Sequence, residues 1–246
     1  MKPLQKEASS LDELQQSYDQ IYQGWLGKHR NVDQAEKMLR MLDVQPGRRV
    51  LDIGCGMGYV LDQAASKGLV PSGIDLSWVA LHTAKERNRL SSAVVQGSAE
   101  DLPWADNTFD YVICLGSLEH FLDPSRAVSE AARVLKPDGK AAILVPNSHH
   151  IRSIYNVYKF GEVLSDSQDF ERFATRREWE TLLAENGLRV TKVSKCDMGM
   201  ARAHKKGRLL FWYLYNILFH VFGGWWIPLN LTYSFIFISE KKREAK

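Results

Sequence analysis

The sequence feature that most constrains the fold is a short apolar run that ends in three glycines at alternate positions. Residues 50–58 read VLDIGCGMG, with the glycines at Gly54, Gly56 and Gly58. Apolar β-forming residues before a glycine cluster predict a buried strand that enters a tight turn, and a helix is expected over 59–67. Glycine lacks the Cβ that would keep a ligand from the backbone, and the amides at the start of the next helix face that ligand. The turn therefore predicts a nucleotide-type binding site.

The spacing of the glycines and the residue before them narrow the type of ligand. The dinucleotide fingerprint is Gly-x-Gly-x-x-Gly, whereas this turn reads Gly-x-Gly-x-Gly and is followed by Tyr59. Asp52 precedes the first glycine by two residues, and a carboxylate there would repel a pyrophosphate but suit a cationic amino group. The combination resembles motif I of the class I S-adenosylmethionine-dependent methyltransferases, whose cofactor carries an ammonium, a sulfonium and no phosphate.

Alternating strand and helix patterns follow the glycine turn. Helices are expected over 78–90 and 124–135, and strands over 69–76, 93–97, 109–114 and 141–145. This order of blocks resembles the branch that includes the ubiquinone and menaquinone methyltransferases (methyltransferase type 11), closely over 45–150 and loosely over 175–195 and 231–240. The resemblance implies an α/β fold with a Rossmann-like, doubly wound, seven-stranded and mostly parallel sheet that has a final antiparallel strand.

The resemblance also implies S-adenosyl-L-methionine as the cofactor, together with a set of residues that hold it. Asp75 follows the glycines by about 20 residues, where an acidic residue binds ribose hydroxyls in doubly wound folds. The alternative is a charge that only favours entry into the next helix. Ser98 stands where the family usually has an aspartate for the adenine amino group, so a weaker hydrogen bond is expected there. The predicted cofactor-binding residues are Asp52, Gly54, Gly56, Gly58, Asp75, Leu76, Ser98, Ala99, Glu100 and Leu115.

Histidines follow two of the expected strands, at the edge where open α/β sheets bind ligands. His120 comes after the strand over 109–114, and His149 and His150 come after the strand over 141–145. These three are the candidate catalytic residues, as bases that take a proton from the acceptor. The alternative for His120 is a packed, hydrogen-bonded side chain.

A metal site is also considered at the first of these histidines. Some quinone-pathway O-methyltransferases bind a metal through Glu-x-x-Glu-His after the fourth strand. Here residues 116–120 read GSLEH, so the first carboxylate is missing and only two candidate ligands remain. We therefore predict no required metal.

Residues 1–45 are expected to form an N-terminal helical extension ahead of a methyltransferase domain over 46–246. Apolar residues fall at helical spacing within 11–44, which predicts two helices. In related methyltransferases such an extension packs over the cofactor as part of a lid, and Tyr18, Tyr22 and Trp25 are the candidate lid residues. The alternative is that the two helices only cover an edge of the sheet.

A basic and aromatic segment over 200–230 is expected to be an insertion before the last strand. Residues 209–229 read LLFWYLYNILFHVFGGWWIPL, and basic residues cluster over 202–208. The length would allow a membrane span, but polar residues, glycines and a proline interrupt the run. The strand expected over 231–239 must also lie on the same side of the membrane as the rest of the sheet, which a spanning segment would prevent. Residues 202–229 fit a peripheral membrane contact or a cap over a hydrophobic substrate, with a dimer surface and plain core packing as alternatives.

Composition sets the remaining expectations. The chain has 246 residues, three cysteines and a formal net charge of +3, which fits one core in a reducing compartment and gives no reason to expect nucleic-acid binding. We expect a cytoplasmic location with peripheral contact at the membrane, and the oligomeric state is open. The predicted function is methyl transfer to a hydrophobic small-molecule or lipid-like acceptor, at oxygen, carbon or nitrogen. The alternative is a catalytically inactive, membrane-associated protein that binds the cofactor.

Overall fold

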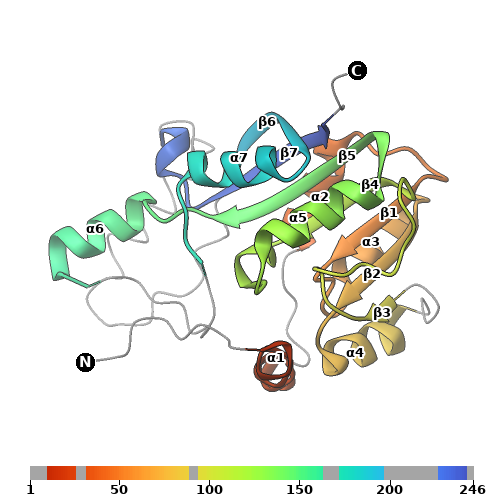
Figure 1. The fold of residues 1–246 in the computed structure, drawn as a ribbon. Helices are drawn as coiled ribbons and strands as arrows, with labels where there is room; N and C mark the ends of the chain where they lie inside the picture. Colours follow the sequence, from red (N-terminus) through yellow and green to blue (C-terminus); the bar gives the residue numbers. More distant parts are fainter. Residues whose placement is uncertain (1–9, 26–31, 89–93, 163–171, 197–226, 243–246) are drawn as a thin grey trace.

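The computed structural model describes residues 10–25, 32–88, 94–162, 172–196 and 227–242, and a seven-stranded sheet with the order β3-β2-β1-β4-β5-β7-β6 lies at its centre (Figure 1). Strand β7 pairs antiparallel with β5 and β6, while the other pairs are parallel. The doubly wound, mostly parallel sheet that the sequence predicts is therefore confirmed. Its strands are β1 (Arg49–Ile53), β2 (Val70–Asp75), β3 (Val94–Gln96), β4 (Phe109–Leu115), β5 (Leu135–Pro146), β6 (Leu188–Cys196) and β7 (Ser234–Lys241).

Helices cover both faces of the sheet because the central strands bury side chains on both sides. Successive residues of a strand point to opposite faces. Val50 of β1 therefore packs in the cluster that contains α2 (Val32–Leu42) and α3 (Tyr59–Ser66). Its neighbour Leu51 packs in the cluster that contains α5 (Pro124–Val134) and α7 (Arg176–Glu185). Helix α4 (Trp78–Asn88) buries Leu81 beside Val94 of β3. This double covering explains the continuous apolar runs over 111–115 of β4 and 141–145 of β5.

The order of the strands reverses at the centre of the sheet. From β1 the chain builds outward to β2 and β3 on one side, and β4, β5, β7 and β6 complete the sheet on the other. In open α/β sheets, ligands bind outside the carboxyl ends of the strands at such a reversal. Ile53 at the end of β1 pairs with Ile74 of β2, so the glycine turn and the end of β2 meet at this point.

Two elements differ from those that the sequence predicts. Strand β5 begins at Leu135 instead of residue 141. Residues 136–139, between the predicted helix and strand, continue the pairing with β4 across a register shift, in which Phe109 pairs with Leu135 and Tyr111 with Lys140. Helix α6 (Ile151–Phe160) was not predicted; it follows β5 and extends away from the sheet (Figure 1).

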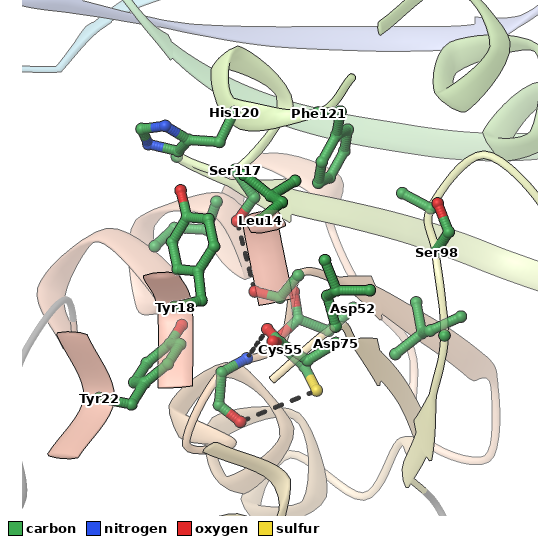
Figure 2. Close-up of a pocket in the computed structure, with 18 of the residues that line it drawn as sticks. Leu14, Tyr18, Tyr22, Asp52, Cys55, Asp75, Ser98, Ser117, His120 and Phe121 are labelled. Carbon is green, nitrogen blue, oxygen red and sulfur yellow. Dashed lines mark hydrogen bonds between the residues drawn. The ribbon is translucent and has the colours of Figure 1, made fainter. Parts of the chain in front are cut away.

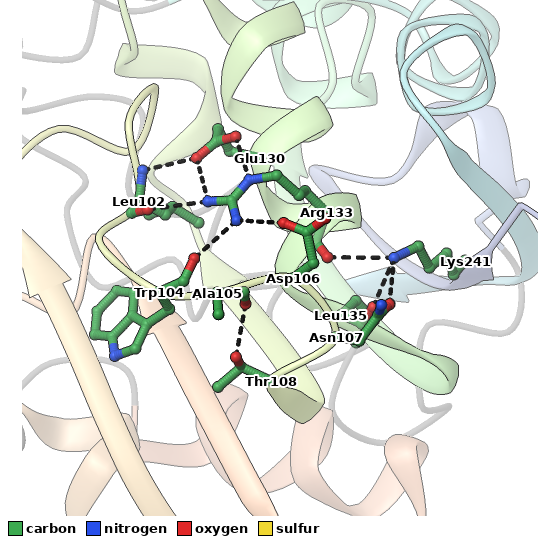
Figure 3. Close-up of polar contacts among 10 residues, drawn as sticks. All are labelled: Leu102, Trp104, Ala105, Asp106, Asn107, Thr108, Glu130, Arg133, Leu135 and Lys241. Atoms are coloured by element: carbon green, nitrogen blue, oxygen red, sulfur yellow. Dashed lines mark hydrogen bonds and ion pairs between the residues drawn. The ribbon is translucent and has the colours of Figure 1, made fainter.

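A charged network anchors the loop over 97–108, which leaves the sheet after β3. The guanidinium of Arg133 donates to Glu130 at 2.7 Å and to the Leu102 carbonyl at 3.0 Å. Glu130 in turn accepts from the Leu102 amide at 2.8 Å, and its hydrogen bond with Arg133 lowers the pKa of Glu130. Lys241 of β7 donates to Asn107 Oδ1 at 2.7 Å (Figure 3). The loop is therefore fastened to α5 and β7 at its far end, while its near end reaches the strand reversal.

The terminal segments are described only in part. Helix α1 (Leu11–Trp25) and α2 are the two helices predicted over 11–44, although the side chain of Trp25 is outside the described residues. Most of the predicted 200–230 insertion is also outside them. Its described end buries Ile227 against α6 and leads through the short helix η2 (Leu229–Leu231) into β7. In the described ranges, no helix combines the length and apolar character needed to cross a membrane.

Candidate active site

The turn after β1 has a backbone conformation that favours glycine. Gly54, Gly56 and Gly58 have φ angles of +73°, +50° and +80°, in the left-handed region. A Cβ on Gly54 would lie 2.4 Å from Ser117 Oγ, and a Cβ on Gly56 would lie 2.7 Å from Tyr22 Oη. The missing side chains therefore allow two distant segments, the loop after β4 and helix α1, to approach the turn.

Asp52 provides a buried carboxyl group beside this turn. The residue is 1% exposed, and neither side-chain oxygen has a hydrogen-bond partner in the described part of the chain. Burial and, to a smaller extent, the charge of Asp75 raise the pKa of Asp52 well above its ordinary value. A buried carboxyl group in this state gains most from a ligand that brings a cation, because the cation compensates the cost of burying the negative charge.

Asp75, the last residue of β2, connects the glycine turn to the next helix. Its Oδ2 accepts from the Gly56 amide at 2.7 Å, and its Oδ1 accepts from the Ser77 amide at 2.8 Å. Burial raises the pKa of Asp75 to about 6, although these hydrogen bonds oppose the rise. The contact with Ser77 is the helix-entry role considered as an alternative from the sequence. Asp75 also lines the cavity described next, where its oxygens retain lone pairs for a ligand's hydroxyl groups.

A cavity opens over the carboxyl ends of β1, β2 and β4. Figure 2 shows Asp52 and Asp75 between Ser98 on one side and Tyr18 and Tyr22 of α1 on the other. The predicted cofactor-binding residues that line the cavity are Asp52, Gly54, Gly56, Asp75, Leu76, Ser98, Ala99, Glu100 and Leu115. Gly58 does not line it and instead occupies the N-cap position of α3. The structure thus brings these residues together from four separate segments of the chain.

The loop after β3 contributes Ser98 and Glu100 to this cavity. Ser98 Oγ accepts from the Glu100 amide at 3.1 Å. The carboxylate of Glu100 accepts from the Asp123 amide at 3.0 Å, and its carbonyl accepts from Arg126 Nε at 2.7 Å. Glu100 therefore fixes the loop against the start of α5. The Ser98 hydroxyl keeps its donor and a lone pair for a neutral ligand group.

His120 lies at the other end of the cavity, in the short helix η1 (Leu118–His120) after β4. The residue is 8% exposed, and its ring stands edge-on to Tyr18 with the centroids 5.8 Å apart. Glu119 Oε1 is 3.9 Å from His120 Nε2, so a carboxyl oxygen lies beside the imidazole ring. The apolar side chains of Leu11, Leu14 and Phe121 also line the cavity. The structure therefore places a basic group inside a largely apolar pocket.

His149 and His150, the other two catalytic candidates, do not line this cavity. His150 caps α6, where its Nδ1 accepts from the Ser153 amide at 3.2 Å, and its ring centroid is 4.6 Å from that of Tyr233. His149 is exposed, with its Nδ1 2.7 Å from Ser148 Oγ. The chain turns directly from β5 into α6, so both rings are engaged at the base of that helix and the structure does not bring them beside His120.

The described ranges contain no group of three or more His, Cys, Asp or Glu side chains arranged to hold a metal ion. At η1, Glu119 and His120 are adjacent, and the position where a further carboxylate would be needed is Gly116.

A family model described as a methyltransferase domain matches residues 51–143. The match contains the glycine turn, Asp75, the loop with Ser98 and the helix with His120. This match and the relatives described next support a class I S-adenosylmethionine-dependent methyltransferase of the type 11 branch. The family match thus covers most of the segments that build the cavity, with α1 outside it.

Two similar curated proteins have names from quinone pathways. Ubiquinone biosynthesis O-methyltransferase of Coxiella burnetii is 28% identical over 155 residues, which are 60% of this chain and 66% of that protein, just under two thirds of its length. Demethylmenaquinone methyltransferase of Bacillus licheniformis is 26% identical over 217 residues, which are 79% of this chain and 93% of that protein. Among solved structures, phosphoethanolamine N-methyltransferase 2 of Haemonchus contortus, in complex with S-adenosyl-L-methionine, has the same fold with a TM-score of 0.62 and 22% identity, covering 95% of this chain and 58% of that one.

Sequence reasoning missed part of the methyltransferase cavity. Leu11 and Leu14 line it with Tyr18 and Tyr22, and their helical spacing was visible, but spacing does not tell which surface a helix face meets. Ser117 and Phe121 flank η1 and carry no motif of their own. Asp19 lies beside this face, and its side chain accepts hydrogen bonds from Ser77 and Val79 at the start of α4. No local pattern predicts such a contact.

Proposed function

We propose that this methyltransferase moves a methyl group from S-adenosylmethionine to a hydrophobic small-molecule or lipid-like acceptor. The observation that carries the proposal is a cavity that joins the glycine turn and its two carboxyl groups to an apolar pocket containing His120. The names of the two quinone-pathway relatives support an acceptor of this class. The relatives' own reactions do not decide the acceptor of this chain, which spans only part of the first of them.

The polar end of the cavity fits the chemical groups of the cofactor. The buried carboxyl of Asp52, which has no hydrogen-bond partner in the described chain, would receive the cofactor's ammonium group. Asp75 would accept hydrogen bonds from the ribose hydroxyls. The loop at Ser98 and Ala99 would receive the adenine, with a neutral hydroxyl in place of the usual carboxylate. The glycine turn would leave the space that a side chain at Gly56 would fill.

The remaining task of the protein is to align an acceptor and to assist its deprotonation. When bound, the cofactor supplies a methyl group that its sulfonium already activates. The apolar end of the cavity would hold the acceptor in line with this group and exclude water. His120 would take the proton of a phenol or other hydroxyl acceptor as the new oxygen–carbon bond forms. The neighbouring carboxylate of Glu119 stabilises the imidazolium that results.

Residues 1–45 are proposed to act as the lid of a methyltransferase domain over 46–246. Leu14, Tyr18 and Tyr22 of α1 face the cavity. The close approach of Tyr22 to Gly56 means that this helix forms the wall directly over the glycine turn. A helix in this place would both shield the reaction from water and shape the acceptor pocket.

We further propose that residues 202–229 bring this enzyme to a membrane surface, where a lipid-like acceptor would be found. The described neighbour of this segment supports the proposal. Helix α6 packs the partly buried side chains of Ile151 and Tyr155 against Ile227 and also carries exposed apolar side chains, with Val157 50% and Tyr158 86% exposed. An exposed apolar surface next to a basic and aromatic segment is typical of an interfacial contact.

Calorimetric titration with S-adenosylmethionine, with NADH as the control ligand, tests the cofactor. We expect S-adenosylmethionine alone to bind. Absence of binding by the wild-type protein would contradict the proposed function.

Release of S-adenosylhomocysteine tests the acceptor, measured with demethylated phenols that carry short or long isoprenoid tails. We expect turnover to rise with tail length. Turnover should fall in His120→Gln and remain unchanged in the matched variant His82→Gln, because the His82 side chain is 59% exposed on α4. The site of the transferred isotope-labelled methyl group identifies the acceptor atom. Equal turnover of a short-tailed and a long-tailed acceptor would contradict the hydrophobic substrate class.

The membrane proposal is tested by flotation with anionic liposomes. The deletion should remove residues 209–225 with a short linker and retain Ile227 and Leu229, because Ile227 is fully buried and Leu229 packs against the main core. We expect the deletion variant to bind S-adenosylmethionine normally but to lose liposome association. Unchanged association would contradict the role of this segment.

A further inference from the structure

Asp19 connects the helix over the cavity to the helix that follows β2. It lies on α1 one residue after Tyr18, which lines the cavity. The Asp19 side chain therefore points sideways from that inner face, toward α4. Its Oδ1 accepts from Ser77 Oγ at 2.5 Å and from the Val79 amide at 3.2 Å. One carboxylate of α1 thus holds two donors at the N-terminus of α4.

These contacts match the needs of the helix terminus. The first amides of a helix have no partner within the helix, and its N-terminus carries a partial positive charge. Ser77 caps α4 by accepting from the Ala80 amide at 3.1 Å. The Val79 amide is another of these first amides, and the carboxylate of Asp19 accepts its hydrogen bond. A residue from another helix therefore completes the cap of α4, and this completion depends on α1 lying over the cavity.

Ser77 also connects this contact to the cofactor end of the cavity. It is fully buried, and its amide donates to Asp75 Oδ1 at 2.8 Å while its hydroxyl donates to Asp19. Asp75 holds the amide of Gly56 with its other oxygen. A continuous series of hydrogen bonds therefore runs from α1 through Ser77 and Asp75 to the glycine turn.

We propose that Asp19 is a positioning residue that latches α1 over the cavity and couples the closure of this lid, through Ser77, to the carboxylate of Asp75. Departure of α1 breaks both contacts of Asp19 and leaves the Val79 amide without its partner. Ordering of Asp75 by a ligand fixes Ser77 in the position that receives Asp19. The identity of that ligand rests on the proposed function, whereas the latch is a property of the chain itself.

Hydrogen exchange of the ligand-free protein tests the latch without any ligand. We expect Asp19→Ala to speed amide exchange along α1 and at Val79 by about tenfold, the factor for losing a hydrogen bond to a charged group. Asp12→Ala is the matched control, because Asp12 is an exposed aspartate in the first turn of the same helix. Asp19→Asn retains an acceptor oxygen without the charge, so its exchange should be intermediate. Equal exchange in Asp19→Ala and the wild type would overturn the proposal.

Stopped-flow dissociation of S-adenosylmethionine tests the coupling to the cavity. We expect the dissociation rate to rise about tenfold in Asp19→Ala, with little change in the association rate, because the lid opens more often once its latch is lost. The double variant Asp19→Ala/Ser77→Ala should change the rate by less than the product of the single effects, because both residues act in one contact. A wild-type dissociation rate in Asp19→Ala, or independent effects in the double variant, would refute the coupling.

The two readouts separate this proposal from the proposed function. If the wild-type protein binds no S-adenosylmethionine but Asp19→Ala speeds amide exchange, the latch stands and the proposed cofactor is refuted. If the wild-type protein binds the cofactor and Asp19→Ala equals the wild type in both measurements, the proposed function stands and the latch is refuted.

Discussion

The raised pKa of Asp75 predicts that S-adenosylmethionine binding weakens in acid through this single side chain. A ribose hydroxyl donates best to the charged carboxylate, and protonation removes both the charge and an acceptor position. Because the pKa of Asp75 is about 6, nearly every molecule has an ionised Asp75 at pH 8, whereas about one in eleven has it at pH 5. The contribution of Asp75 to the association constant should therefore fall about tenfold between these pH values.

The variant Asp75→Asn removes the charge of Asp75 at every pH. At pH 8 the loss of a hydrogen bond to a charged group costs about 1.5–3 kcal/mol, or about 10- to 150-fold in Kd. The amide nitrogen of asparagine cannot accept, so the amide of either Gly56 or Ser77 also loses its partner. At pH 5 the ratio of variant to wild-type Kd should shrink about tenfold, because most wild-type molecules have already lost the charge.

Isothermal titration at pH 5, 6, 7 and 8 and constant ionic strength measures this ratio. Titration of the ligand affects both proteins and cancels, whereas titration of Asp52 cancels only in part, because the charge of Asp75 contributes to the raised pKa of Asp52. Asp101→Asn, at an exposed aspartate of the loop after β3, is the matched control and should leave Kd unchanged at every pH. A ratio that stays constant from pH 5 to pH 8 would refute the link between Asp75 ionisation and binding. A ratio near one throughout would remove Asp75 from the cofactor site.

The stability of the ligand-free protein should depend on pH in the opposite direction. The folded-state pKa of Asp75, about 6, is above its ordinary value of 3.8. Its contribution to stability is therefore complete below pH 3.8 and is lost as the pH rises through 6. The full contribution is about 3 kcal/mol, of which about 1.4 kcal/mol separates pH 5 from pH 8. Urea unfolding at the two pH values should show this gain in acid for the wild type and a smaller one for Asp75→Asn. An equal change in both proteins would contradict the raised pKa.

Three further perturbations test other parts of the site. Gly56→Val should lower the affinity for S-adenosylmethionine by about 100-fold or more, because the new side chain meets Tyr22 Oη at a position with φ of +50°. The control Gly47→Ala also has a positive φ but open space around it, so it should bind normally in the same titration. Asp52→Asn should raise the melting temperature of the ligand-free protein, since burial disfavours the charged carboxyl, yet weaken binding about tenfold or more in calorimetry. His120→Gln should lower kcat for a hydroxyl acceptor about 100-fold or more with a nearly unchanged cofactor Kd, and an unchanged kcat would exclude His120 as the base.

The sequence predicted those parts of the fold that local patterns determine. The glycine turn, the strands on either side of it and Asp75 each depend on spacing within a short segment, and the structure brings these segments together at the strand reversal. His120 could be placed at the ligand-binding edge because it follows β4 directly. The same rule placed His149 and His150 at that edge, but helix α6 begins at once and engages their rings elsewhere. An edge position is therefore not enough to predict which way a side chain points.

Other features depend on contacts between distant residues. The segment over 136–139 lies between the helix and the strand that the sequence predicts, yet it continues β5. Lys136 pairs with Asp110 of β4 at 2.8 Å and holds the extra residues against that strand. Asp19 belongs to no sequence motif. Its partners lie 58 and 60 residues away along the chain, so no local pattern identifies them.

The two ends of the cavity come from different parts of the fold, and this division has a consequence for specificity. The polar end is formed by strand ends and the turns after them, whose groups also hold one another in place, as Asp75 holds Gly56 and Ser77. A change there disturbs the turn as well as the ligand. Leu11 and Leu14 of α1 and Phe121 after η1 add apolar side chains to the cavity. These side chains take no part in the hydrogen bonds that hold the turn, so they can change without breaking it. We therefore expect the choice of acceptor to be encoded mainly in the inner face of α1, while the sheet determines the cofactor. Because α1 lies outside the matched domain of residues 51–143, relatives that share the cofactor end can differ in their acceptors.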